Sequence, residues 1–129
     1  MISRLKKDII LENGILYDPV LDEKSKASIL ISDGLIKKIG KISSNKNIKR
    51  IDCEGKLITP GFIDLHAHFR EPGREDKETL ETGSMAAMSG GFTRVCVMPN
   101  TNPPLDSPES IRFIMERSKD LCIQIYPIG

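Results

Sequence analysis

Short runs of alternating apolar and polar residues fill the first 59 positions of the chain. Each of three dipeptides stands between two such runs: Asn13-Gly14, Asp33-Gly34 and Glu54-Gly55. A turn dipeptide that ends in glycine and is flanked by alternating apolar residues is a strong short-range signal for a β-hairpin. The pattern therefore predicts that residues 1–59 form a small antiparallel sheet, as part of a β-sandwich domain.

From Pro60 the pattern changes to apolar strands that alternate with helices. The expected elements are a strand at 61–69, a helix within 77–91, a strand at 92–99, a helix that starts at Ser107 as its N-cap, and a strand at 121–129. Such an alternation is typical of a parallel sheet whose strands are buried on both faces. It leaves open a doubly wound sheet and the start of a (β/α)8 TIM-like barrel, of which residues 60–129 would form only the first β/α units.

Four polar residues occupy every second position at the end of the first of these strands, within FIDLHAHFREPG: Asp64, His66, His68 and Arg70. Alternate side chains of a strand point to the same face, so these residues form one row. The chain has two histidines, and imidazoles at this spacing can share one zinc ion at Zn–N distances of about 2.0–2.1 Å. Because unpaired imidazoles on a buried strand are costly, the row favours a metal site over structural histidines, with Asp64 supporting a ligand.

Several acidic residues follow the row directly: Glu71, Glu75, Asp76 and Glu78. Their pattern is typical of a solvated loop and of the first turn of the next helix, so we do not expect them to bind the metal. A catalytic zinc site needs at least three protein ligands and an open position. The other ligands are therefore expected outside this sequence.

A second polar segment, MPNTNPP at residues 98–104, directly follows the second apolar strand. Asparagine and proline favour turns for local reasons, so an ordinary turn is one explanation. Parallel strands end at the same rim of a sheet, however, and the histidine row ends at that rim. Asn100 is therefore equally a candidate for contact with a substrate.

Composition and charge narrow the possible classes of function. The chain has 129 residues and a net charge of +1, which gives no basis for binding nucleic acid or an anionic membrane. No apolar run approaches the roughly 20 residues of a membrane-spanning helix, and the N-terminus lacks a secretory signal. Cys53, Cys96 and Cys122 are expected to be buried and reduced, which indicates a cytoplasmic protein.

Three segments together resemble the N-terminal part of the bacterial dihydroorotase family: PGFIDLHAHFREPG, GGFTRVCVMPNTNPPLD and the terminal YPIG. The resemblance covers essentially the whole chain. It implies a metal-dependent cyclic amidohydrolase with a (β/α)8 barrel and a small β-sandwich. The implied reaction is the zinc-dependent, reversible hydrolysis of (S)-dihydroorotate to N-carbamoyl-L-aspartate in de novo pyrimidine biosynthesis.

The same resemblance implies roles for individual residues. His66 and His68 would bind zinc in a binuclear centre. His68, Arg70 and Asn100 would contact the substrate, and the planar guanidinium of Arg70 suits the substrate carboxylate. The other ligands of such a centre, among them a bridging lysine or aspartate, and the aspartate that shuttles the proton are expected beyond Gly129. The chain is thus expected to be a fragment that holds no catalytic residue of its own and is inactive in isolation.

Related families provide alternatives. Allantoinases resemble this strand but carry asparagine in place of Arg70, and dihydropyrimidinases carry an apolar residue there. A positive charge at the site suits an anionic substrate, so Arg70 favours dihydroorotase. A non-catalytic dihydroorotase-like partner subunit is another alternative, although such proteins usually lose the metal histidines. The expected partners are the small-molecule substrate and, in an assembly, further copies of the chain or aspartate carbamoyltransferase.

Overall fold

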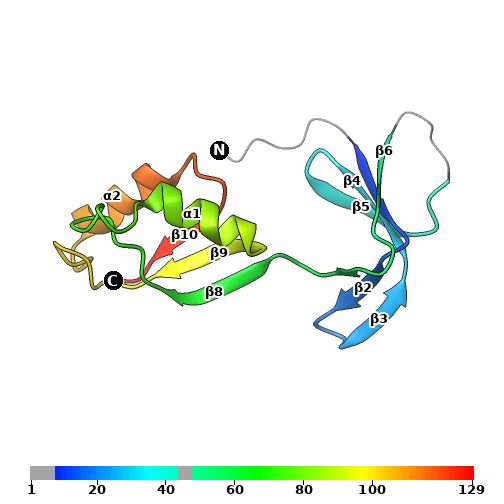
Figure 1. Cartoon of the computed structure of the whole chain (residues 1–129), viewed down its shortest axis with the longest axis horizontal. Helices are drawn as coiled ribbons and strands as arrows, with labels where there is room; N and C mark the ends of the chain where they lie inside the picture. The colour runs from blue at the N-terminus through cyan, green and yellow to red at the C-terminus, as the bar shows by residue number, and fades with distance from the viewer. Residues whose placement is uncertain (1–7, 44–47) are drawn as a thin grey trace. The chain divides into compact units, whose positions relative to one another are not determined.

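The structure is a computed structural model that describes residues 8–43 and 48–129. It divides at Gly61 into two compact units, of which one ends at Pro60 and the other runs to Gly129. The first unit holds strands β1 to β7, and the second holds β8 to β10 with the helices α1 and α2 (Figure 1).

The first unit consists of two small mixed sheets, where the sequence predicted an antiparallel one. One sheet has the strand order β5-β4-β1-β6 and the other has the order β3-β2-β7. The strands are β1 (Ile9–Glu12), β2 (Ile15–Asp18), β3 (Glu23–Lys26), β4 (Ser28–Ser32), β5 (Leu35–Gly40), β6 (Lys49–Asp52) and β7 (Leu57–Ile58). Among the described residues of this unit, the buried apolar side chains are Ile10, Ile29 and Cys53.

One of the three predicted hairpins is confirmed. At Asp33-Gly34, β4 pairs antiparallel with β5, and the two turn residues have φ angles of 52° and 72°. The hairpins predicted at Asn13-Gly14 and Glu54-Gly55 are wrong, because β1 pairs in parallel with β6 and β2 pairs in parallel with β7. Both dipeptides instead carry the chain from one sheet into the other, and the backbone N–H of Ile15 donates to the carbonyl of Lys56 at 2.9 Å between them.

The second unit is a three-stranded parallel sheet with the order β10-β9-β8, and both helices lie on the same side of it (Figure 1). Its elements are β8 (Phe62–Ala67), α1 (Leu80–Ser89), β9 (Phe92–Val97), α2 (Pro108–Ser118) and β10 (Gln124–Pro127). The predicted order of strands and helices and their parallel pairing are confirmed.

Local sequence signals set the ends of both helices. Thr79 and Ser107 are the N-caps of α1 and α2, and each forms a capping box with the residue three positions later. Pro108 occupies the start of α2, where its missing N–H costs nothing. Gly91, with a φ of 83°, allows the chain to leave α1 and enter β9. Neither helix in the described part of the chain has the length and apolarity to cross a membrane.

The parallel sheet is buried on one face only, which corrects the prediction of strands buried on both faces. The side chains between sheet and helices form one core: Phe69, Leu80, Val95, Val97, Leu105, Ile114, Ile123 and Ile125. On the opposite face, Arg94 Nε donates to Gln124 Oε1 at 2.8 Å, and Ile63, which aligns with Arg94, is 51% exposed. Among the described strands, β8 and β10 each pair with β9 alone, so both outer edges of the sheet are unpaired.

The three cysteines are free, but their predicted burial is wrong for two of them. Cys53 is buried, Cys96 is half-buried and Cys122 is exposed. The Cys122 thiol lies 3.4 Å from the hydroxyl of Ser84 on α1. The apolar residues beside Cys122 in the sequence therefore do not indicate its burial.

Replacing Ile114 by alanine is expected to destabilise the second unit by about 2–5 kcal/mol, because the side chain is fully buried and its removal leaves a cavity. Met115→Ala is the matched control on the same helix, since Met115 is 47% exposed and should cost less than about 1 kcal/mol. Urea unfolding of the protein, followed by circular dichroism, measures both. Equal losses would contradict the assigned buried face of α2.

Candidate metal centre

The two histidines converge at the carboxyl end of β8. His66 lies within β8 and His68 follows directly after its last residue. Their Nε2 atoms are 3.2 Å apart, and the ring planes are inclined by 67° with centroids 5.0 Å apart. Both side chains are exposed to solvent. The end of the strand therefore presents two ring nitrogens to one accessible point.

An irregularity in the pairing of β8 with β9 accompanies this convergence. Asp64 aligns with Val95 and Ala67 aligns with Val97, so three residue steps on β8 face two on β9. Within this stretch the backbone N–H of His66 donates to Asp64 Oδ1 at 2.9 Å. Bulges of this kind redirect side chains next to functional sites. Asp64 thus fixes the backbone of His66, whereas the sequence suggested that it would support a ligand side chain.

Asn100 reaches the same site from the loop after β9. Its Oδ1 atom lies 2.9 Å from His68 Nδ1. An amide oxygen only accepts hydrogen bonds, so this contact requires the tautomer of His68 whose proton is on Nδ1 and whose lone pair is on Nε2, the atom that faces His66. This arrangement is the one in which an imidazole can bind a metal through Nε2.

The distance between the two Nε2 atoms fits a shared ion. Two nitrogens that are each about 2.0–2.1 Å from a tetrahedral zinc ion are about 3.3–3.4 Å apart, close to the 3.2 Å found here. Across residues 8–43 and 48–129, however, no group of three or more His, Cys, Asp or Glu side chains is placed to hold a metal. Among the described residues, His66 and His68 are thus the two side chains whose ring nitrogens converge closely enough to share an ion.

Two of the four acidic residues after the row, Glu75 and Asp76, have hydrogen-bond partners within their own loop. Glu75 accepts a hydrogen bond from the backbone N–H of Gly73 at 2.9 Å. Asp76 accepts two from Arg74, at 2.8 and 2.9 Å, and these bonds lower the pKa of the Asp76 carboxyl. Both carboxylates are therefore engaged within the exposed loop between β8 and α1.

Glu71 differs from its neighbours, and its sequence pattern gave no sign of this. Its side chain is only 6% exposed, and it accepts hydrogen bonds from the backbone N–H of Leu80 and from Arg117 Nε. The expectation of a solvated loop residue is wrong here, because α1 and α2 both contribute a donor to the carboxylate. A glutamate next to proline after an apolar strand carries no local signal of such burial.

Arg70 lies beyond the end of β8 and is exposed. Within the described ranges its guanidinium forms no hydrogen bond or ion pair, and its backbone carbonyl accepts the N–H of Arg74 at 2.9 Å. The structure thus brings His66, His68 and Asn100 into contact and leaves the charged group of Arg70 available to an external anion.

A family model and curated relatives match most of this sequence. The model of the dihydro-orotase-like family matches residues 55–127. The dihydroorotases of Caldicellulosiruptor saccharolyticus and Bacillus subtilis are both 44% identical to the chain, over 124 and 120 residues, which are 94% and 92% of this chain. The matches cover 29% and 26% of those relatives, so the chain spans little more than a quarter of their length.

A solved structure shares the fold as well. The L-hydantoinase (dihydropyrimidinase) from Arthrobacter aurescens has a TM-score of 0.80 and 28% sequence identity, over 95% of this chain and 28% of that protein. Since the family model alone covers more than half of the sequence, and includes the histidine pair and Asn100, the chain belongs to the dihydroorotase-like family.

Proposed function

We propose that this chain is the N-terminal part of a zinc-dependent dihydroorotase, which hydrolyses (S)-dihydroorotate reversibly to N-carbamoyl-L-aspartate in pyrimidine biosynthesis. The observation that carries the proposal is the convergence of His66 and His68 at 3.2 Å, with Asn100 on the second of them. The dihydroorotases that resemble the chain at 44% identity support the reaction. The free cysteines support a cytoplasmic location.

In this proposal the second unit is the start of a (β/α)8 barrel. The unpaired edges of β8 and β10 support it, because a barrel closes by pairing such edges with further strands. The uncovered face of the sheet would then line the barrel interior, and the loops at the carboxyl ends of the strands would form the active site. The first unit would be part of the small β domain.

His66 and His68 would be two of the zinc ligands. When bound, zinc in such a site activates a water molecule and polarises the amide carbonyl of the substrate. The remaining ligands and the proton-shuttle aspartate would come from other parts of the complete protein, so the isolated chain should not turn over dihydroorotate. Further copies of the chain, or aspartate carbamoyltransferase, are its proposed partners.

The side-chain amide of Asn100 would form hydrogen bonds with two groups, His68 and the substrate. Its Oδ1 atom accepts a hydrogen bond from the Nδ1–H group of His68, which leaves both hydrogens of Nδ2 available as donors. These hydrogens would donate to the substrate carboxylate. One residue would thereby link the orientation of a metal ligand to the orientation of the substrate.

Arg70 would bind the same carboxylate with its planar guanidinium, and this contact would select dihydroorotate over uncharged cyclic amides. Because a hydantoinase shares the fold, uncharged cyclic amides are the main competing class of substrate. This class corresponds to the alternative functions of an allantoinase or a dihydropyrimidinase. The other alternative, a non-catalytic partner subunit, is disfavoured by the retained histidine pair. A stable complex of the complete gene product without hydrolase activity would support that alternative.

Arg70→Ala in the complete protein should weaken dihydroorotate binding by about 1.5–3 kcal/mol, because a charge-assisted contact is lost. The KM for dihydroorotate measures this effect, and zinc content should stay unchanged. Arg74→Ala is the matched control in the same loop, since Arg74 is paired with Asp76 and should not affect KM. A normal KM in Arg70→Ala would argue against a dihydroorotase.

Asn100→Ala should lower zinc affinity by about 10- to 100-fold, because His68 loses the acceptor that keeps its Nε2 atom unprotonated. Competition with a chelator of known affinity measures this in the complete protein, without any assay of activity. Asn102→Ala, in the same loop, should retain wild-type zinc affinity. Equal zinc affinities for all three proteins would show that Asn100 does not orient a metal ligand.

A further inference from the structure

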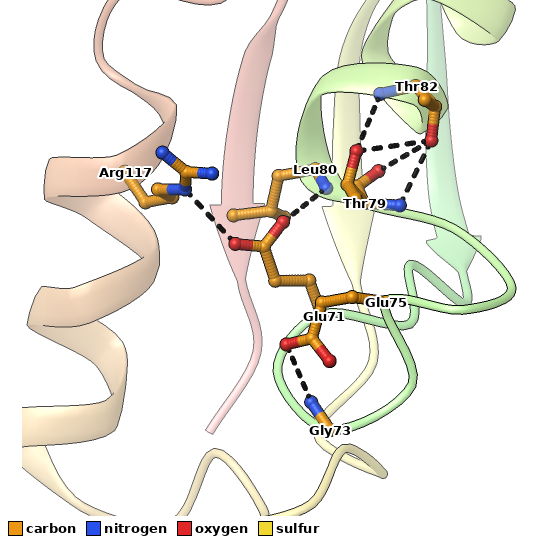
Figure 2. A network of polar contacts seen from close by, with 7 residues as sticks. All are labelled: Glu71, Gly73, Glu75, Thr79, Leu80, Thr82 and Arg117. Carbon is orange, nitrogen blue, oxygen red and sulfur yellow. Dashed lines mark hydrogen bonds and ion pairs between the residues drawn. The ribbon is translucent and has the colours of Figure 1, made fainter.

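Glu71 is a buried acidic residue that the proposed chemistry does not use. Its Oε2 atom accepts the backbone N–H of Leu80 at 2.8 Å, and its Oε1 atom accepts Arg117 Nε at 3.1 Å. Figure 2 shows the carboxylate between the start of α1 and the side chain of Arg117 on α2. It thus ties the loop after β8 to both helices of the unit.

The cost of burying a charge makes this arrangement informative. A carboxylate taken out of water is unfavourable unless both oxygens find strong partners. Glu71 has two: a cation, and an N–H in the first turn of a helix, where the helix dipole favours negative charge. The loop is therefore held at Glu71 by contacts that a neutral or shorter side chain reproduces only in part.

The position of Glu71 in the chain determines what these contacts hold. Arg70 is exposed between two buried neighbours, Phe69 at 7% and Glu71 at 6%. The ring of Phe69 packs on α1, so closely that a Cβ atom at Gly83 would lie 2.9 Å from it. With one anchor on each side, the backbone of Arg70 has a fixed position and its side chain points away from the core.

The same loop also contacts the loop that carries Asn100. The carbonyl of Pro72 accepts the backbone N–H of Asn102 at 3.1 Å. Gly73, with a φ of 101°, lies against Asn102 so closely that any Cβ atom there would collide with its backbone. The anchored loop therefore relates the position of Arg70 to that of the second substrate-binding residue.

We propose that Glu71 is a positioning residue, whose contacts with Leu80 and Arg117 fix Arg70 for binding the substrate carboxylate. This inference rests on the proposed function, since it gives Arg70 an anionic substrate. Glu71 acts through Arg70 and touches no substrate, so its loss should affect substrate binding more than the chemical step. His66 and His68 precede the anchored loop, so zinc binding should not depend on Glu71.

The test compares Glu71→Gln and Arg117→Gln in the complete, zinc-loaded protein. The first variant removes the negative partner of the ion pair and the second removes the positive partner. Because the Arg117 side chain is 59% exposed, its replacement should leave the fold intact. We expect a rise in the KM for dihydroorotate of about 5- to 10-fold, with kcat changed less than about twofold and zinc content unchanged. Arg117→Lys, which restores a cation, should recover part of the loss.

Two exposed residues provide matched controls. Glu81→Gln makes the same change of charge in the first turn of α1, and Arg112→Gln makes the same change on α2 as Arg117→Gln. Neither control should alter KM. A difference between the two pairs of variants separates the Glu71–Arg117 contact from a general effect of net charge.

A double-mutant cycle with Arg70→Ala provides the decisive comparison. If Glu71 acts by placing Arg70, Glu71→Gln should have almost no further effect on KM once Arg70 is alanine. Additive effects on KM, or a fall in thermal stability with normal KM in both Glu71→Gln and Arg117→Gln, would overturn the proposal and leave the proposed function intact. Absence of dihydroorotate turnover in the unmodified protein would overturn both.

Discussion

Two imidazole rings meet at the end of β8, and the account of this protein depends on that contact. His66 lies in β8 and His68 directly follows it, and the irregular pairing between Asp64 and Ala67 accompanies the approach of their Nε2 atoms to 3.2 Å. Two exposed rings at the end of an edge strand could separate freely in water. Asn100 restrains one ring and Asp64 restrains the backbone of the other, so the pair has a defined geometry.

The rim around this pair is irregular in structure but is connected to the core. The loop after β8 is anchored through Phe69 and Glu71, and it contacts the loop after β9 through Pro72 and Asn102. Functional loops on a rigid scaffold can hold polar groups in positions that a free loop cannot maintain. The backbone from which the Arg70 side chain extends is therefore fixed, although no described residue binds its exposed guanidinium.

The sequence predicted most of the second unit, because its signals are local. Ser107, Pro108 and Gly91 act within a few residues of the helix ends that they determine. Strand pairing in the first unit was harder to predict. Asn13-Gly14 specifies a bend, but whether β1 pairs with β2 or with β6 depends on a segment nearly 40 residues away. Glu71 was missed for the same reason, since Arg117 lies 46 residues further along the chain.

The histidine pair was predictable because its spacing is a property of one strand, whereas its restraint by Asn100 required the neighbouring loop. The most direct test of the account is a crystal structure of the complete protein with anomalous data collected at the zinc edge. The account predicts a zinc ion bound by both Nε2 atoms, His66 and His68, at about 2.0–2.1 Å, with Asn100 still on His68 Nδ1. Zinc bound elsewhere, or rings that have separated with no ion between them, would contradict it.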